Sequence, residues 1–138
     1  MSKSIKEIVG KKDFGQSKFV VATDPCYDEG TYGTIDLELV PGKYDCVVWK
    51  DYEGTVVLMG IYLNGIVPNV KSMECVGTIG VDAGLAGFAE NKPDYSDEEW
   101  RKFCKNFYVD GKSVADAVIC EEGFFAVSGY GDGCYPVY

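Results

Sequence analysis

The alternation of apolar and polar residues predicts that most of this chain forms short β-strands. Apolar and acidic side chains alternate strictly over residues 35–39, which is typical of a strand with one face buried and one face in water. Residues 18–23 are rich in β-favouring side chains, and Asp24-Pro25 ends this strand because proline cannot donate to a ladder. Residues 1–17 are polar and predict a short helix or a loosely packed lead-in.

Two pairs of apolar stretches predict antiparallel hairpins. Residues 43–50 and 55–63 flank a polar turn that contains glycine, and residues 117–120 and 124–127 flank a second such turn. Asn64-Gly65 is a strong turn signal directly after the first pair. Together these stretches indicate a meander of antiparallel strands.

Two glycine-rich segments are expected to bring backbones close together. Residues 75–88 contain four glycines and predict two short strands around a turn at residues 82–84. Residues 128–138 predict a tight glycine turn, followed by a strand that completes the last hairpin.

One stretch has helical periodicity instead. Ser96 and Glu99 have the spacing of a capping box, and acidic residues crowd the first turn, where the helix dipole favours them. The apolar residues that follow recur with helical spacing and predict one amphipathic helix at about 96–109. They are Trp100, Phe103, Cys104, Phe107 and Tyr108.

These elements together predict the fold class. A chain of 138 residues has the length of one domain and buries enough surface to fold without a metal or a disulfide. We predict a single domain over residues 1–138 that is mainly β (α+β). Its antiparallel strands form a sandwich or half-barrel, and the helix covers one face.

The net charge of the chain limits the classes of molecule that it is expected to bind. The formal net charge of −9 argues against non-specific nucleic-acid binding and against anionic membranes. A small anionic ligand held by backbone N–H groups stays compatible with that charge. The chain has no histidine, which removes the commonest general base and metal ligand. We therefore expect no cofactor, no metal and no catalytic residue set.

The six cysteines bear on the compartment. None forms a C-x-x-C pair, so a structural zinc site is not indicated. The first residues lack an apolar signal core, and no run reaches membrane-spanning length. We expect a cytoplasmic protein with reduced thiols. The even cysteine count keeps a secreted, disulfide-bonded protein as the alternative.

Three aspartates are the sharpest candidates for chemistry. Asp24, Asp82 and Asp132 each lie beside glycine, alanine or proline next to a predicted strand, and we expect these turns to meet in space. Three carboxylates could bind Mg²⁺ or Ca²⁺, or two could divide the roles of acid and base. The alternative is that each aspartate accepts a backbone N–H group within its own turn.

Tyrosines flank the same turns. Aromatic faces beside glycine-rich backbone suit a stacked nucleobase, and free N–H groups suit phosphate. The alternative is that these rings line a sheet face with their hydroxyls in water. The candidate ligand-binding residues are Asp24, Tyr27, Asp82, Gly84, Tyr130, Asp132 and Tyr135.

Three motifs carry a resemblance to known proteins. They are Asp24-Pro25-Cys26-Tyr27, Val81-Asp82-Ala83-Gly84 and the stretch from Tyr130 to Val137 that reads YGDGCYPV. In this order they resemble a group of small proteins of unknown function from bacteriophages and bacteria, loosely over residues 18–138. The resemblance implies a soluble, β-rich single domain with no assigned reaction. It also leads us to expect a further strand after Tyr138, so a homo-oligomer is an open alternative.

The first functional hypothesis is a binding protein. It would be phage- or bacterium-derived and would sequester a small molecule, such as a nucleotide immune signal, as an anti-defence protein in the host cytoplasm. One alternative is an acidic module that engages a basic protein partner. The other alternative is an aspartate-dependent hydrolase.

Overall fold

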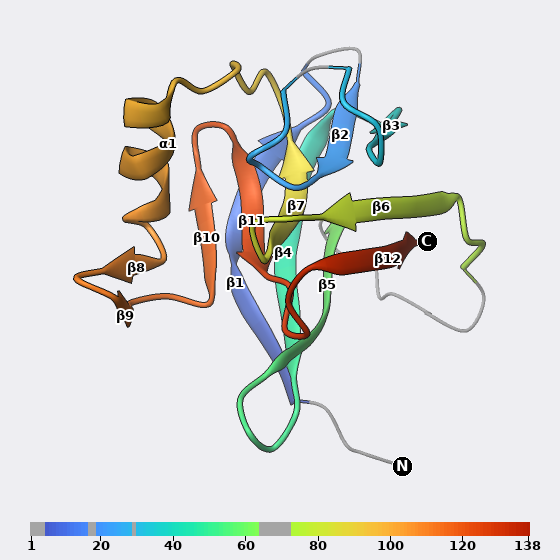
Figure 1. The fold of residues 1–138 in the computed structure, drawn as a ribbon. Helices are drawn as coiled ribbons and strands as arrows, with labels where there is room; N and C mark the ends of the chain where they lie inside the picture. The colour runs from blue at the N-terminus through green and yellow to red at the C-terminus, as the bar shows by residue number, and fades with distance from the viewer. Residues whose placement is uncertain (1–4, 17–18, 29, 64–72) are drawn as a thin grey trace.

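The computed structural model of the protein describes residues 5–16, 19–28, 30–63 and 73–138. Over these residues, the chain forms several antiparallel β-sheets and one helix (Figure 1). The prediction of a mainly β, antiparallel fold with one helix is therefore confirmed. The predicted turn at Asn64-Gly65 lies outside the described residues.

One sheet has three strands, β1 (Ile5–Phe14), β4 (Gly42–Lys50) and β5 (Val56–Leu63), in the order β1-β4-β5. The predicted β4–β5 hairpin is present. Its turn is closed by the Asp51 carboxylate, which accepts the N–H groups of Glu53 and Thr55 at 3.0 and 2.9 Å. This is an Asx-type turn, in which a short side chain replaces a backbone partner.

The prediction for residues 1–17 was wrong, because residues 5–14 form the ten-residue strand β1. This strand pairs with β4 from Ile5 to Phe14, with a bulge between Ile8 and Gly10. Most of its side chains are exposed, and Lys11 forms an ion pair with Asp45 at 3.5 Å. Lysines on an edge strand discourage pairing with other chains. In the sequence, the same lysines obscure the alternation of apolar and polar residues that would identify the strand.

The second sheet has five strands in the order β10-β11-β7-β2-β3. Their bounds are β10 (Ala117–Cys120), β11 (Gly123–Val127), β7 (Leu85–Ala89), β2 (Val20–Thr23) and β3 (Ile35–Leu37). The predicted hairpin of β10 and β11 is present, with Cys120 opposite Gly123.

The last strand, β12 (Gly133–Val137), does not complete that hairpin as predicted. It pairs instead with β6 (Gly77–Val81), and Figure 1 shows this ribbon running across the strands of the five-stranded sheet. The inward side chains of the ribbon, among them Ile79 and Tyr135, pack against Ala22 and Ala86. Burial of this apolar face over a long sequence distance outweighs local continuation of the hairpin.

The five-stranded sheet is packed on both faces. Phe124 contributes to a core shared with the three-stranded sheet, while Phe125 points to the other face and packs against Phe103 and Phe107. Adjacent residues of a strand point to opposite faces, so one strand supplies both cores. The two sheets form a sandwich, and the helical segment covers the outer face.

The helix α1 (Asp97–Cys104) begins as predicted but ends earlier. Ser96 and Glu99 form the capping box, since each side chain accepts the other's backbone N–H group. The chain then tightens, because the N–H groups of Lys105 and Asn106 donate to carbonyls only three residues earlier. The predicted helix at about 96–109 is therefore too long at its C-terminal end.

Residues after α1 form a small hairpin of β8 (Tyr108–Val109) and β9 (Lys112–Ser113). Asp110 and Gly111 have φ of 52° and 76°, as a tight two-residue hairpin turn requires. Within the part of the chain that the structure describes, no helix has the length and apolarity to cross a membrane. All six cysteines are free thiols.

Candidate functional site

Asp24 is the most deeply buried acidic residue of the described chain, with none of its surface exposed. Its Oδ1 accepts the N–H group of Cys26 at 2.8 Å. Its Oδ2 accepts the N–H groups of Asp82 and Ala83 at 2.8 and 2.7 Å. We call this arrangement the aspartate clasp: the Asp24 carboxylate and the N–H groups of Cys26, Asp82 and Ala83.

The clasp joins the end of β2 to the turn between β6 and β7. A buried carboxylate is costly unless hydrogen bonds replace its lost water, and three N–H donors supply that compensation here. Both oxygens of Asp24 are thus committed to backbone donors. The predicted bond from Asp24 to a backbone N–H group of its own turn is present, with Cys26 as the donor. The carboxylate also accepts from a second turn 58 residues away.

Tyr27 links the same two turns through its side chain. Its hydroxyl donates to Asp82 Oδ2 at 3.2 Å. Burial, and then the bond to the Asp82 carboxylate, raise the pKa of Tyr27 to about 12. Gly80 lies close to it, since a Cβ atom at this position would lie 3.3 Å from the Tyr27 hydroxyl. The Tyr27 hydroxyl therefore lies between Asp82 and the backbone of Gly80.

Cys26 lies in this environment as a protonated thiol. Burial, and then the hydrogen bond to Asp24, raise its pKa to about 12. Because the thiolate is the reactive form, this position is unsuited to a nucleophile.

Hydrogen bonds from side chains and backbone hold the glycine-rich loop of residues 128–133. The Ser128 and Tyr135 hydroxyls both donate to the carbonyl of Gly131 at 2.7 Å. The Ser128 N–H group donates to the carbonyl of Gly84 at 2.9 Å. The loop is thereby fixed to the turn between β6 and β7.

Gly129 fixes the other side of this loop. Its φ is 76°, and a Cβ atom there would lie 2.0 Å from the Val56 carbonyl oxygen. No side chain fits at that distance, so the loop backbone packs directly on the start of β5. This close approach was the expectation for a glycine-rich segment.

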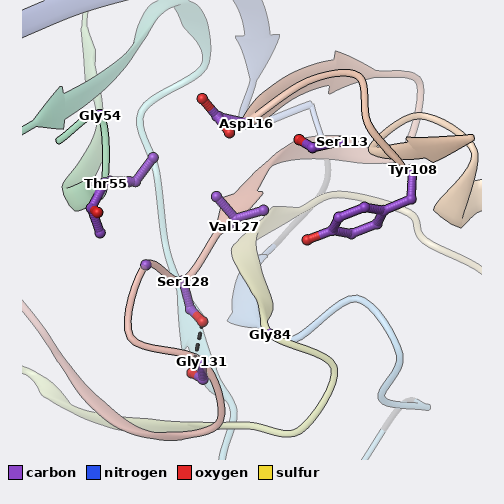
Figure 2. Close-up of a pocket in the computed structure, with 11 residues that line it drawn as sticks. Gly54, Thr55, Gly84, Tyr108, Ser113, Asp116, Val127, Ser128 and Gly131 are labelled. Carbon is purple, nitrogen blue, oxygen red and sulfur yellow. Dashed lines mark hydrogen bonds between the residues drawn. The ribbon is translucent and has the colours of Figure 1, made fainter. Parts of the chain in front are cut away.

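A cavity of about 370 Å³ opens beside this loop, and we call it the cradle cavity (Figure 2). Figure 2 shows the Tyr108 ring and the Ser113 and Asp116 side chains on one side, and the glycine-rich loop on the other. Its lining residues come from four separate parts of the chain. They are Gly54, Thr55, Val56, Gly84, Tyr108, Ser113, Asp116, Val127, Ser128, Gly129 and Gly131.

Asp116 is the one charged side chain among the described residues that line the cradle cavity. Its carboxylate lies 3.0 Å from Lys50 Nζ, which also lies 3.3 Å from a carboxylate oxygen of Glu7. The hydrogen bonds to these carboxylates raise the pKa of Lys50, Asp116 contributing most. Lys50 is thus shared between two acids, so the region keeps a negative excess.

A second cavity, of about 610 Å³, lies along β2 and β3. Three threonines are prominent among its lining residues, so we call it the threonine cavity. Its lining is Phe19, Val21, Thr23, Tyr27, Asp28, Gly30, Thr31, Thr34, Asp36, Ala89, Asn91 and Lys92. It shares no lining residue with the cradle cavity.

The structure distributes the seven predicted site residues over several environments. Gly84 lines the cradle cavity and Tyr27 lines the threonine cavity. Tyr130 is 73% exposed, and the Asp132 side chain is also exposed. The remaining three are Asp24 and Asp82, which meet at the clasp, and Tyr135, which bonds the glycine-rich loop.

The three aspartate turns are neighbours, although none of the three aspartates lines the cradle cavity or the threonine cavity. Gly133 lies opposite Val81 in the β6–β12 ladder. Asp132, just before β12, and Asp82, just after β6, therefore lie at the same end of this strand pair. Over residues 5–16, 19–28, 30–63 and 73–138, no group of three or more acidic or cysteine side chains is arranged to hold a metal ion. The arrangement therefore supports a structural role for Asp24.

Sequence reasoning missed the side chains that give the cradle cavity its polarity. Thr55, Ser113 and Asp116 carry no motif, and they lie in connections or, for Ser113, in the two-residue strand β9. Only the glycines of the loop indicated that another segment packs closely on this backbone. They do not identify the other segments that line the cavity. No protein-family model, curated protein or solved structure matches this chain.

Proposed function

We propose that this protein binds a small molecule in the cradle cavity. The observation that carries the proposal is the convergence of four distant chain segments on one cavity of about 370 Å³, with the glycine-rich loop fixed beside it. That volume lies within the range of about 300–1,000 Å³ for small-molecule sites. Fixed loops also reduce the entropy that binding must offset.

The lining favours a neutral or amine-bearing ligand rich in hydroxyl groups. Thr55, Ser113 and Tyr108 supply hydroxyls, and Asp116 supplies a hydrogen-bond acceptor with negative charge. No lysine or arginine lines this cavity among the described residues. A phosphate would therefore depend on backbone N–H groups alone.

Binding without turnover is the better-supported activity. Asp24 is committed to three N–H donors, and Asp82 and Asp132 are exposed. A protein that binds without turnover acts on its ligand by sequestration. The resemblance to phage proteins makes a host immune signal, including a nucleotide, a ligand class to include in any test.

The test is a thermal-shift screen followed by calorimetry, with polyols, primary amines, and linear and cyclic nucleotides as separate arms. A ligand that binds only the folded protein raises its melting temperature as concentration exceeds Kd. We expect a rise with the polyol or amine arm. Failure of every arm at millimolar concentration would contradict the proposal.

Two variants separate the cavity from the ion-pair network behind it. Asp116→Asn and Glu7→Gln each remove one carboxylate partner of Lys50, but only Asp116 lines the cavity. We expect Asp116→Asn to weaken binding of an amine by about tenfold, as loss of one charge-assisted hydrogen bond does. Glu7→Gln should bind like the unmodified protein, and equal effects of both variants would place the ligand elsewhere.

A further inference from the structure

The threonine cavity is a second recess whose chemistry differs from that of the cradle cavity. At about 610 Å³ it is the larger of the two, and its lining comes from residues 19–23, 27–28, 30–36 and 89–92. Because the two cavities share no lining residue, a ligand in one contacts none of the side chains of the other.

Two aromatic side chains line this cavity. Phe19 is 39% exposed, and the Tyr27 hydroxyl donates to Asp82. Aromatic faces of this kind stack on the flat rings of nucleobases, whichever base is present.

The hydroxyl protons of the three threonines are donated to backbone carbonyls. Thr23 donates its hydroxyl proton to the carbonyl of Asp24 at 2.9 Å, and Thr31 donates to that of Asp28 at 2.7 Å. Thr34 donates to the carbonyl of Thr31 at 3.1 Å. With their protons committed to backbone, these oxygens offer lone pairs. A ligand that reaches these oxygens is a donor to them.

The charged groups point to the same conclusion. Asp28 and Asp36 line the cavity with exposed carboxylates, which are strong acceptors for hydroxyl and amino groups. Lys92 is the one cationic residue of the described lining. Its Nζ donates to the Pro93 carbonyl at 2.8 Å and lies 4.3 Å from the centre of the Tyr95 ring.

Two carboxylates against one engaged lysine leave this cavity with negative charge, in a chain whose net charge is −9. A phosphate group would meet repulsion there. A ribose has hydroxyl donors and no charge, and bases such as adenine and cytosine add amino donors.

We propose that the threonine cavity binds an uncharged nucleoside, with its base against Phe19 and Tyr27 and its ribose hydroxyls donating to Asp28 and Asp36. This proposal is independent of the cradle cavity, and each can fail without the other.

The experiment is a calorimetric titration of the whole protein with adenosine, cytidine, adenosine monophosphate, ribose and glucose as separate arms. We expect saturable binding of the nucleosides and weaker binding of the monophosphate. Ribose and glucose, which lack the base, should bind at least about tenfold more weakly than adenosine, as expected from loss of one stacked base.

Matched variants locate the site. Asp36→Asn should weaken adenosine binding by about tenfold, because it removes a charged acceptor. Glu38→Gln removes an exposed acid two residues away that does not line the cavity, and it should leave binding unchanged. Phe19→Ala should also weaken binding, whereas Asp116→Asn in the cradle cavity should not.

Three results would overturn the proposal. The monophosphate binding as tightly as adenosine would show a phosphate site, and glucose binding as tightly and equally weakened by Asp36→Asn would show a sugar site in this cavity. Absence of nucleoside binding at millimolar concentration would show that the cavity is not used in this way.

Discussion

Asp24 and Asp82 carry the same side chain, but the fold gives them different surroundings. The Asp24 carboxylate is fully buried and accepts three backbone N–H groups, while the Asp82 side chain is exposed and accepts the Tyr27 hydroxyl. At this scale, burial and donor count decide whether an aspartate holds the fold together or faces solvent.

The same substitution at both positions tests this difference. Asparagine at position 24 offers one acceptor oxygen, and its amide donor would face N–H groups. We expect Asp24→Asn to lower the free energy of unfolding by about 3–5 kcal/mol, since bonds to a buried charge are worth about 1.5–3 kcal/mol each.

Asp82→Asn keeps an acceptor for Tyr27 and lies in water, so its cost should stay below about 1 kcal/mol. Urea unfolding monitored by tryptophan fluorescence measures both values. Equal losses for the two variants would show that the clasp adds no special stability.

The sequence predicts some of the hydrogen bonds of Asp24 but not the others. The Asp24-Pro25 pair predicts a strand end and an Asx-type turn, and the bond from Cys26 confirms the turn. The bonds from Asp82 and Ala83 join residues that lie far apart in the chain. Local propensity carries no information about such a contact.

At the scale of elements, the glycine-rich loop shows why glycine is needed at one position more than at another. Gly129 and Gly131 both have positive φ, at 76° and 80°. A Cβ atom on Gly129 would clash with the Val56 carbonyl oxygen. A Cβ atom on Gly131 would have no neighbouring atom within 4 Å.

Alanine substitutions separate backbone strain from steric clash. Gly131→Ala should cost about 1–2 kcal/mol in the free energy of unfolding, the cost of the left-handed conformation alone. Gly129→Ala must also displace the loop from β5, so we expect a loss of more than about 3 kcal/mol. Thermal and urea unfolding provide the comparison, and indistinguishable variants would contradict the packing of the loop on β5.

Elements were predictable where their signals are local. The capping box of Ser96 and Glu99 predicts the start of α1, and the apolar pairs predict the β4–β5 and β10–β11 hairpins. The strand β1 was missed because exposed lysines mask its alternation. The partner of β12 was missed because it is chosen by burial against distant residues.

At the scale of the whole molecule, the packing of separate sheets creates the cradle cavity, whereas the threonine cavity is formed by one sheet and its loops. The cradle cavity lies where the start of β5, the end of β11 and the segment after α1 come together. The threonine cavity lies at the β2–β3 end of the five-stranded sheet. A sequence predicts strands far better than the places where sheets leave space between them, so Asp116 and Ser113 had no signal.

The most direct test of the central claim is chemical-shift mapping on ¹⁵N-labelled protein, with the best ligand from the polyol and amine screen. We predict that the largest changes occur at the backbone amides of Gly54, Gly84, Gly129 and Gly131, which line the cradle cavity. Changes centred on any other part of the molecule, with these four amides unaffected, would contradict the assignment of the ligand site to this cavity.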